Sequence, residues 1–245
     1  MRMKMVISYD GTNFSGFQVQ PGKRTIQAEI EKALGKMHKT DQVRIVASGR
    51  TDSGVHAIGQ VVHFDTQLQI EPNNWLRALQ SLLPTDIEVV DIEKVDDHFH
   101  ARYDATSKEY RYIILQREQR DIFKRHYAYW ISDSLDVVKM KQALSYIEGK
   151  HDFTSFCAAN SGVKGDKIRT VLQATIEAQG DELIFTIKGD GFLYNMVRII
   201  VGTMVEVGKG KRNPEEIIDI LQAKNRKLAG KTAPAHGLFL WNVQY

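Results

Sequence analysis

The sequence contains one cysteine and lacks the marks of secreted or membrane proteins. Cys157 has no second cysteine with which to form an internal disulfide, so nothing indicates an oxidising compartment. The first ten residues, MRMKMVISYD, have no apolar core of the kind found in a signal peptide. The longest apolar stretch, RIIVGTMVEVG, is too short and interrupted to cross a bilayer. These absences predict a cytoplasmic protein that does not span a membrane.

Net charge is also scarce, at +3 for the whole chain of 245 residues. The total conceals basic regions, because Lys and Arg outnumber Asp and Glu by nine to four in residues 1–50, seven to four in 102–125 and seven to three in 209–231. Residues 65–97 show the reverse, with eight acids and two basic residues. Basic regions of this kind can form a surface that binds a polyanion, although a solvated face is the commoner explanation of any one such segment.

The first half of the chain predicts an alternation of strands and helices. Strands are expected at 1–9, 43–48, 60–66 and 87–95, and helices at 26–37 and 72–83, the first of them capped by Thr25. The order β-α-β-β-α-β is that of the ferredoxin-like unit, which the RRM uses to present a sheet to RNA. We therefore expect a first α/β unit at 1–104.

The second half predicts another α/β unit, at 105–245. Its pattern favours strands at 107–116, 126–132, 167–179, 181–190 and 237–245, and helices at 136–148, at 192–208 and from Asn213-Pro214 onward. The fold class expected for the chain is α+β, with two ferredoxin-like or RRM-like units, antiparallel sheets and a central catalytic cleft.

The string GRTDSGVH, residues 49–56, places an aspartate between two expected strands. Gly49 and Gly54 allow unusual backbone angles and the close approach of another molecule. Arg50 lies two residues before Asp52, so an ion pair is feasible, and it would hold the carboxylate ionised for use as a nucleophile or general base. A plain turn residue is the competing interpretation, because Asp and Gly are common in turns.

Asp-Ser-Gly is also the short signature of aspartic proteases. That chemistry uses two carboxylates sharing one proton, and a neighbouring arginine opposes proton sharing. A dimer could supply the second aspartate, so the flanking Arg50 weakens this alternative without eliminating it. The residues alone leave Asp52 as a candidate carboxylate of unknown substrate.

Longer strings in the chain resemble one known family. GRTDSGVHA is similar to the signature of the bacterial tRNA pseudouridine synthase A family, the tRNA pseudouridine-38/39/40 synthases. The other strings that carry the resemblance, in chain order, are YDGTNFSGFQ, GQVVHF, FHARYDA, KEYRYII, HDFTSF, GDGFLYNMVRIIVG and APAHGLFL. Together they extend over nearly the whole chain.

The resemblance implies a cofactor-free isomerase that converts uridine to pseudouridine at positions 38, 39 and 40 of the tRNA anticodon stem-loop. It also implies a homodimer with a basic cleft. Asp52 corresponds to the nucleophile and Arg50 to its neighbour in the motif. Tyr110 corresponds to the tyrosine that stacks on the target base, and Arg198 to the basic residue that pairs with the aspartate.

The basic segments supply candidate phosphate contacts, although a basic residue taken singly is more often an ordinary surface charge than a contact. We expect RNA contacts from Lys23, Arg24, Arg102, Lys108, Arg111 and Arg125, with Arg120 and Lys124 as further candidates. His98 and His100 form a weak metal-binding pattern without supporting ligands, so we expect no metal site. The alternative function is a non-catalytic RNA-binding protein built from paired ferredoxin-like units.

Overall fold

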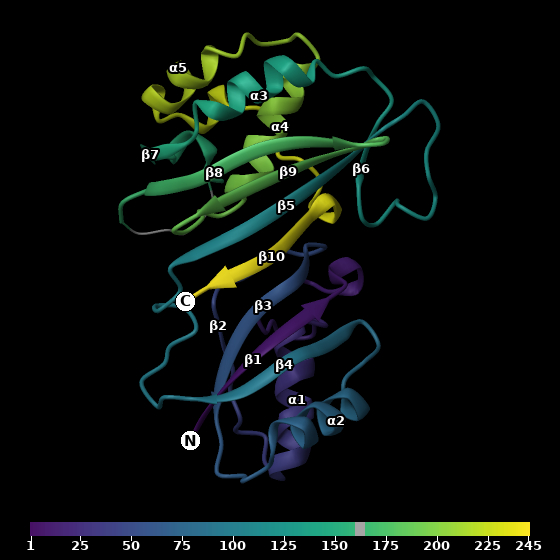
Figure 1. The fold of residues 1–245 in the computed structure, drawn as a ribbon, viewed down its shortest axis with the longest axis vertical. Helices are drawn as coiled ribbons and strands as arrows, with labels where there is room; N and C mark the ends of the chain where they lie inside the picture. Colours follow the sequence, from purple (N-terminus) through teal and green to yellow (C-terminus); the bar gives the residue numbers. More distant parts are fainter. Residues whose placement is uncertain (160–164) are drawn as a thin grey trace. The chain divides into compact units, whose positions relative to one another are not determined.

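The computed structural model describes residues 1–159 and 165–245 and has a mixed α+β fold (Figure 1). The chain forms two compact units, Met1–Thr106 with Phe239–Tyr245 and Ser107–Leu238. This division lies two residues beyond the boundary expected at 104/105. The closing strand, expected in the second unit, contributes its residues from Phe239 onward to the first.

The first unit follows the predicted β-α-β-β-α-β order. Its elements are β1 (Arg2–Tyr9), α1 (Ile26–His38), β2 (Val46–Ala47), β3 (His56–Asp65), α2 (Pro72–Leu82) and β4 (Ile87–Val95), with the short helix η1 (Gly11–Asn13) after β1. Strand β1 lies between β4 and β3 and is antiparallel to both. Two strands pair with the other edge of β3: β2 antiparallel, and β10 (Leu238–Gln244) parallel.

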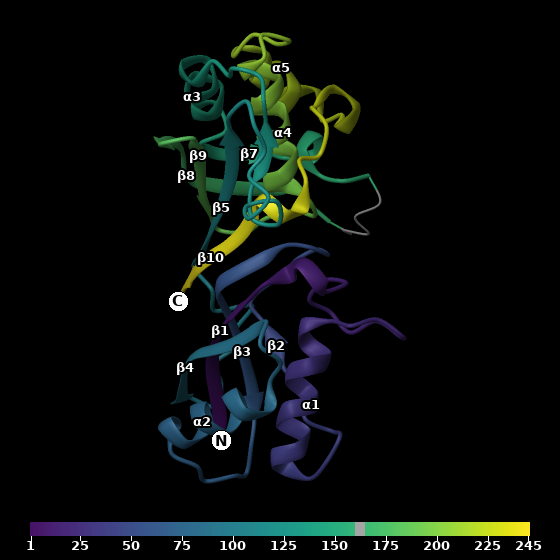
Figure 2. The same cartoon turned by 90° about the vertical axis from the view of Figure 1, so that its right-hand side faces the viewer.

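Alternating burial gives the first sheet its apolar face. In β1, Met3, Met5 and Ile7 are buried while the residues between them are partly exposed, as expected for a strand with one covered face. Helices α1 and α2 lie against this face (Figures 1 and 2). Trp75 of α2 and Leu34 of α1 are fully buried, so the hydrophobic effect holds these layers together.

Strand β2 is shorter than its sequence predicts. Val43 and Ile45 are buried and Arg44 is exposed, so the expected alternation is present. The Ile45 amide, however, donates to the Glu31 carboxylate of α1 at 3.1 Å. Because that amide is used by a side chain, regular pairing with β3 begins only at Val46.

The second unit is built on a sheet with the order β5-β9-β8-β7, antiparallel throughout, with β6 parallel to β5. Its elements are β5 (Ser107–Gln116), β6 (Tyr129–Ile131), α3 (Val137–Ser145), β7 (Gly149–Asp152), β8 (Ile168–Gln179), β9 (Glu182–Gly189), α4 (Met196–Gly208) and α5 (Glu216–Ala223). Short helices η2 (Thr154–Phe156), η3 (Arg226–Leu228) and η4 (Ala235–Gly237) complete it. Strand β7 was not expected from the sequence.

Helix α4 is buried on nearly all sides and is the centre of the second unit's core. It begins at Met196 rather than near 192, because Asn195 has a left-handed backbone with φ of 61°. Helix α5 begins at Glu216 after a tight turn at Asn213-Pro214, and the Glu216 carboxylate accepts the Asn213 amide at 2.7 Å. No helix among the described residues is long and apolar enough to cross a membrane.

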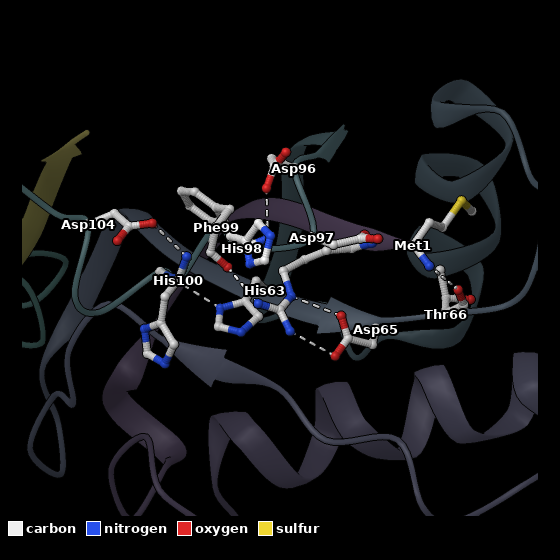
Figure 3. A network of polar contacts seen from close by, with 12 residues as sticks. Met1, His63, Asp65, Thr66, Asp96, Asp97, His98, Phe99, His100 and Asp104 are labelled. Carbon is white, nitrogen blue, oxygen red and sulfur yellow. Dashed lines mark hydrogen bonds and ion pairs between the residues drawn. The ribbon is translucent and has the colours of Figure 1, made fainter.

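A polar network in the first unit ties the start of β1 and the end of β3 to the segment at 96–104 (Figure 3). The Arg2 guanidinium donates to both carboxylate oxygens of Asp65 at 2.9 Å and to the Phe99 carbonyl at 2.8 Å. The Ala101 amide donates to Nδ1 of His63 at 3.0 Å. His63 is buried, so the segment FHARYDA is anchored to the sheet through an imidazole that the sequence did not single out.

Burial, helped by the nearby charge of Arg2 and by His100, lowers the pKa of His63 to about 4. Asp65 and Asp104 act in the opposite direction but more weakly. The imidazole is therefore neutral at pH 7 and able to accept a hydrogen bond at Nδ1.

The low pKa of His63 predicts a pH-dependent loss of stability. The neutral form favours the fold fully above the ordinary pKa of 6.5, and this contribution is lost as the pH falls from 6.5 towards 4. A His63→Asn variant keeps an acceptor for the Ala101 amide but cannot be protonated. Thermal unfolding between pH 7 and 5 should show a smaller fall of Tm for this variant than for the wild type. An His98→Asn control should behave as the wild type does, and equal falls for all three proteins would contradict the assignment.

Candidate active site

The loop that carries Asp52 connects β2 to β3 and closes in a tight turn. The Val55 amide donates to the Asp52 carbonyl at 3.1 Å. Gly54 has φ of 77°, a backbone angle that side chains disfavour, so glycine is required at this turn. Gly49, expected to be similarly unusual, does not have a positive φ. The Asp52 side chain itself is half-buried.

Both neighbours of Asp52 are fixed to the segment that follows β1. The Phe17 amide donates to the Thr51 carbonyl at 3.0 Å, and the Thr51 hydroxyl lies 2.7 Å from the phenol oxygen of Tyr9. On the other side, the Ser53 hydroxyl donates to the Phe14 carbonyl at 3.0 Å. The backbone on either side of the carboxylate is therefore held by residues about 40 positions away.

The two segments approach so closely that one position admits only glycine. A Cβ atom on Gly11 would lie 2.0 Å from the Val55 carbonyl oxygen, which no real contact allows. The Gly11 amide donates to Nδ1 of His56 at 3.0 Å, and the His56 ring stacks on Phe239 of β10 at 4.7 Å. His56 thus joins the loop's exit strand both to η1 and to the closing strand.

The entry side of the loop is held by Gln60 of β3. Its side-chain carbonyl accepts the Ser48 hydroxyl at 2.7 Å, and its amide donates to the Gly49 carbonyl at 2.8 Å. Burial raises the pKa of Tyr9 to about 12, so the phenol stays protonated and keeps its hydrogen bond to Thr51 at neutral pH. The anchors of the loop are therefore uncharged groups.

Arg50 does not form the expected ion pair with Asp52. Its side chain is exposed, and it makes no ion pair or hydrogen bond with any of the residues that the structure describes. The turn at Ser53-Gly54 follows Asp52, so the backbone between Arg50 and Asp52 is not folded back on itself. The inference that Arg50 keeps Asp52 ionised therefore loses its geometric support.

Arg198, in the first turn of α4, is held by two acceptors of the second unit. Its Nε donates to the Ala233 carbonyl at 2.8 Å, and its Nη1 donates to the Asn195 side-chain oxygen at 2.7 Å. The Ala233 amide in turn donates to the Arg198 carbonyl. The guanidinium is half-buried, and these two hydrogen bonds fix its direction.

Tyr110 is buried in β5, with 8% of its surface exposed. Its ring meets Phe192 edge to face, with centroids 5.0 Å apart. Tyr112 lies on the same buried face of the strand, as its spacing predicts, and its phenol donates to the Pro234 carbonyl at 2.8 Å. Tyr110 and Arg198 belong to the second unit, and Asp52 and Arg50 belong to the first.

The six expected RNA contacts differ in how far their charges are already engaged. Arg24 donates from both terminal nitrogens to Asp86, at 2.7 and 2.9 Å, and its guanidinium covers the Phe14 ring at 4.0 Å. The interaction with Asp86 raises the pKa of Arg24. Arg111 pairs with Glu109 at 2.8 Å, and Lys108 is half-buried. Arg24 is nevertheless exposed, as are Lys23, Arg102 and Arg125.

His98 and His100 serve local turns in this structure. The His98 amide donates to Asp96, and Nδ1 of His100 accepts the amides of Arg102 and Tyr103. Within residues 1–159 and 165–245, no group of three or more His, Cys, Asp or Glu side chains is placed to hold a metal ion.

Comparison with known proteins identifies relatives along the whole chain. A tRNA pseudouridine synthase family model matches residues 5–104 and 143–245. The chain is 53% identical over 244 residues to tRNA pseudouridine synthase A of Geobacillus kaustophilus (strain HTA426), covering 100% of this chain and 94% of the relative. It is 55% identical over 246 residues to the protein of the same name from Bacillus subtilis (strain 168), covering 100% of this chain and 99% of the relative.

Among solved structures, the alignment with a chain of "Crystal Structure of a Cbf5-Nop10-Gar1 Complex" covers 82% of this chain and 54% of that chain, with 14% identity and a TM-score of 0.35. A likeness at this TM-score carries no argument about the fold.

The anchoring of the Asp52 loop predicts that Tyr9→Phe loosens it. Loss of the Tyr9 hydroxyl leaves the buried Thr51 hydroxyl without this partner, at a cost of roughly 1–3 kcal/mol in the free energy of unfolding. Hydrogen exchange of the Phe17 and Val55 amides should accelerate. Tyr112→Phe removes an equally buried phenol and serves as the matched control. Exchange at Phe17 and Val55 that is equally slow in both variants would contradict the anchoring role.

Proposed function

This chain belongs to the tRNA pseudouridine synthase family and isomerises uridine to pseudouridine in tRNA, and we propose that it acts at positions 38, 39 and 40 of the anticodon stem-loop with Asp52 as its nucleophile. The observation that carries the role of Asp52 is its setting. The carboxylate sits between two residues whose positions are fixed by hydrogen bonds to the segment after β1. Such pre-organisation is what a reacting group needs.

The isomerisation breaks the bond between C1′ and N1 of the nucleotide and forms a bond between C1′ and C5. The C5 proton is released and N1 gains a proton, so substrate and product have the same composition. No electrons are transferred to or from the base, and a carboxylate nucleophile suffices to hold one fragment while the base turns. The proposal covers attack at either the ribose or the base.

A base inside a helical stack is out of reach of any carboxylate, so the target nucleotide must leave the stack. We propose that Tyr110 provides the aromatic surface against which the extruded base lies. The edge-to-face contact with Phe192 and the position within β5 support a rigid ring. Since the ring is largely covered in the free protein, stacking on it requires a face to be uncovered when RNA binds.

We propose that Arg198 takes part in the same reaction, as the basic partner that the family resemblance assigns to the aspartate. Its two hydrogen bonds to Ala233 and Asn195 support this role, because they fix the direction of a half-buried positive charge. Arg50 is proposed as a contact to RNA rather than to Asp52, on the ground of its exposure.

Among the exposed candidate phosphate contacts we favour Lys23, Arg102 and Arg125 over Arg24. A guanidinium that already binds one carboxylate through two hydrogen bonds gives up that pair when it binds a phosphate.

We also propose, on the family resemblance, that the protein is a cytoplasmic homodimer. The strand order β4-β1-β3 and the short β2 support a ferredoxin-like description of the first unit.

The non-catalytic and protease alternatives gain no support from the comparisons. Relatives that share more than half of their residues with the chain over its whole length are named as synthases.

The role of Asp52 predicts that Asp52→Asn abolishes turnover while leaving tRNA binding intact. The amide has the same shape but is not a nucleophile, so the rate should fall by about a thousand-fold or more. Release of tritium from tRNA labelled at C5 of uridine measures turnover, and filter binding measures affinity. Asp41→Asn, at an exposed position of the same unit, is the control and should release tritium normally. Full release by Asp52→Asn would show that another group is the nucleophile.

The stacking role of Tyr110 predicts a difference between two substitutions. Tyr110→Phe keeps the ring and should bind tRNA within about two-fold of the wild type, whereas Tyr110→Ala should bind about ten-fold more weakly, as loss of one stacked base implies. Filter binding with unmodified tRNA distinguishes them. Equal loss of affinity in both variants would mean that the hydroxyl, not the ring, makes the contact.

A further inference from the structure

The loop that joins β5 to β6, residues 117–128, exposes large apolar side chains to water (Figure 1, the teal segment leading into β6). Phe123 is 81% exposed and Ile122 is 65% exposed. The two residues are adjacent in the chain, so their exposed side chains form one apolar tip of the loop. Exposed apolar groups of this kind commonly mark a binding surface.

The loop presents this tip from a fixed backbone. The Asp121 carboxylate accepts the Phe123 amide at 2.9 Å, and the Asp121 carbonyl accepts the Lys124 amide at 3.2 Å. The Lys124 carbonyl then accepts the amides of Tyr127 and Ala128. Lys124 also pairs with Glu182 of β9 at 2.6 Å, which fastens the loop to the sheet. Because the turn is held on both sides, Phe123 is kept in water by the structure around it.

Two arginines lie close to the tip in the sequence. Residues 117–126 contain four Lys and Arg, of which Arg117 pairs with Asp181 at 3.8 Å and Lys124 with Glu182, so that Arg120 and Arg125 are the two without a carboxylate partner among the described residues. Arg125 donates from Nη1 to the Ile122 carbonyl, which holds its guanidinium beside the apolar tip. Arg120 lies over the Trp130 ring at 4.5 Å, and the Trp130 indole donates to the Arg117 carbonyl at 2.9 Å. The cations are thus positioned by the same loop that exposes Phe123.

The chemistry of the tip distinguishes between two kinds of partner. Burying this loop against a protein would strip water from the guanidinium groups of Arg120 and Arg125, which is costly unless the partner supplies a carboxylate to each of them. Single-stranded nucleic acid fits both features, since its bases stack on aromatic rings and its phosphates neutralise guanidinium groups. Charge complementarity therefore favours RNA.

We propose that Phe123 is a base-stacking residue for an unpaired nucleotide of the tRNA substrate, with Arg125 contacting an adjacent phosphate. This contact lies on the β5–β6 loop of the second unit and is separate from the Asp52 loop. The inference rests on the proposed function in that the RNA is the tRNA on which the enzyme acts. The contact would give the tRNA a further point of attachment on the second unit, beside the expected phosphate contact Arg125.

The test compares substitutions at Phe123 by filter binding of a full-length tRNA transcript and by tritium release. Phe123→Ala should raise Kd and KM about ten-fold and leave kcat at saturating tRNA unchanged, since one stacked base is lost. Phe123→Tyr should bind as the wild type does, and Phe123→Leu should be as weak as Phe123→Ala, because leucine retains apolarity but offers no ring. Val138→Ala, at an apolar position of α3 that is 78% exposed, is the matched control and should change nothing.

Two further measurements separate the partners. Arg125→Gln should lower the slope of log Kd against log salt by about one, as expected for one lost phosphate contact. Sedimentation should give the same molecular mass for wild type and Phe123→Ala. If Phe123→Leu binds tRNA normally, no aromatic ring is needed and the inference is wrong. If Phe123→Ala changes the assembly mass, the tip is a contact between protein chains, and this also contradicts the inference.

The outcomes also separate this inference from the proposed function. A wild-type protein that neither binds nor modifies tRNA contradicts the proposed function itself. A wild-type protein that modifies tRNA, with Phe123→Ala unaffected in Kd and KM, contradicts only the role of Phe123.

Discussion

The close approach of two backbone segments is the constraint on which the site depends. The residues after β1 lie directly against the Asp52 loop, and Gly11 is required because any side chain there would strike the Val55 carbonyl. Hydrogen bonds from Phe17, Tyr9 and Ser53 then fix the backbone before and after the aspartate. The strings YDGTNFSGF and GRTDSGVH are thus two halves of one structural feature, separated by about 40 residues.

Uncharged polar groups hold the Asp52 loop and several other segments of this protein in place. Burial keeps the phenols of Tyr9 and Tyr112 protonated and the imidazole of His63 neutral, and each of these groups has a backbone or hydroxyl partner at hydrogen-bond distance. A neutral group costs less to bury than an ion and still holds a definite direction.

Much of the fold could be predicted because its signals are local. The strands β1 and β4, the helical spacing of α1, and the hairpin of β8 and β9 each depend on residues close together in the sequence, and the structure confirms them. Predicted boundaries were wrong where a residue distant in the sequence sets the boundary. The Glu31 carboxylate accepts the Ile45 amide, so β2 is shorter than expected. The closing strand β10 pairs with β3, which is far from it in the sequence.

The candidate site shows the same division. The sequence by itself determined that Asp52 lies in a glycine-bounded turn between two strands, because local residue types set the turn, and the family resemblance assigned its substrate. Only the tertiary structure decided that Arg50 stands in solvent, that Asp86 already engages Arg24, and that Phe123 projects from a fixed loop. The reason is physical: backbone preference acts over a few residues, whereas the partner of a charge or a ring is chosen by packing between segments far apart in the chain.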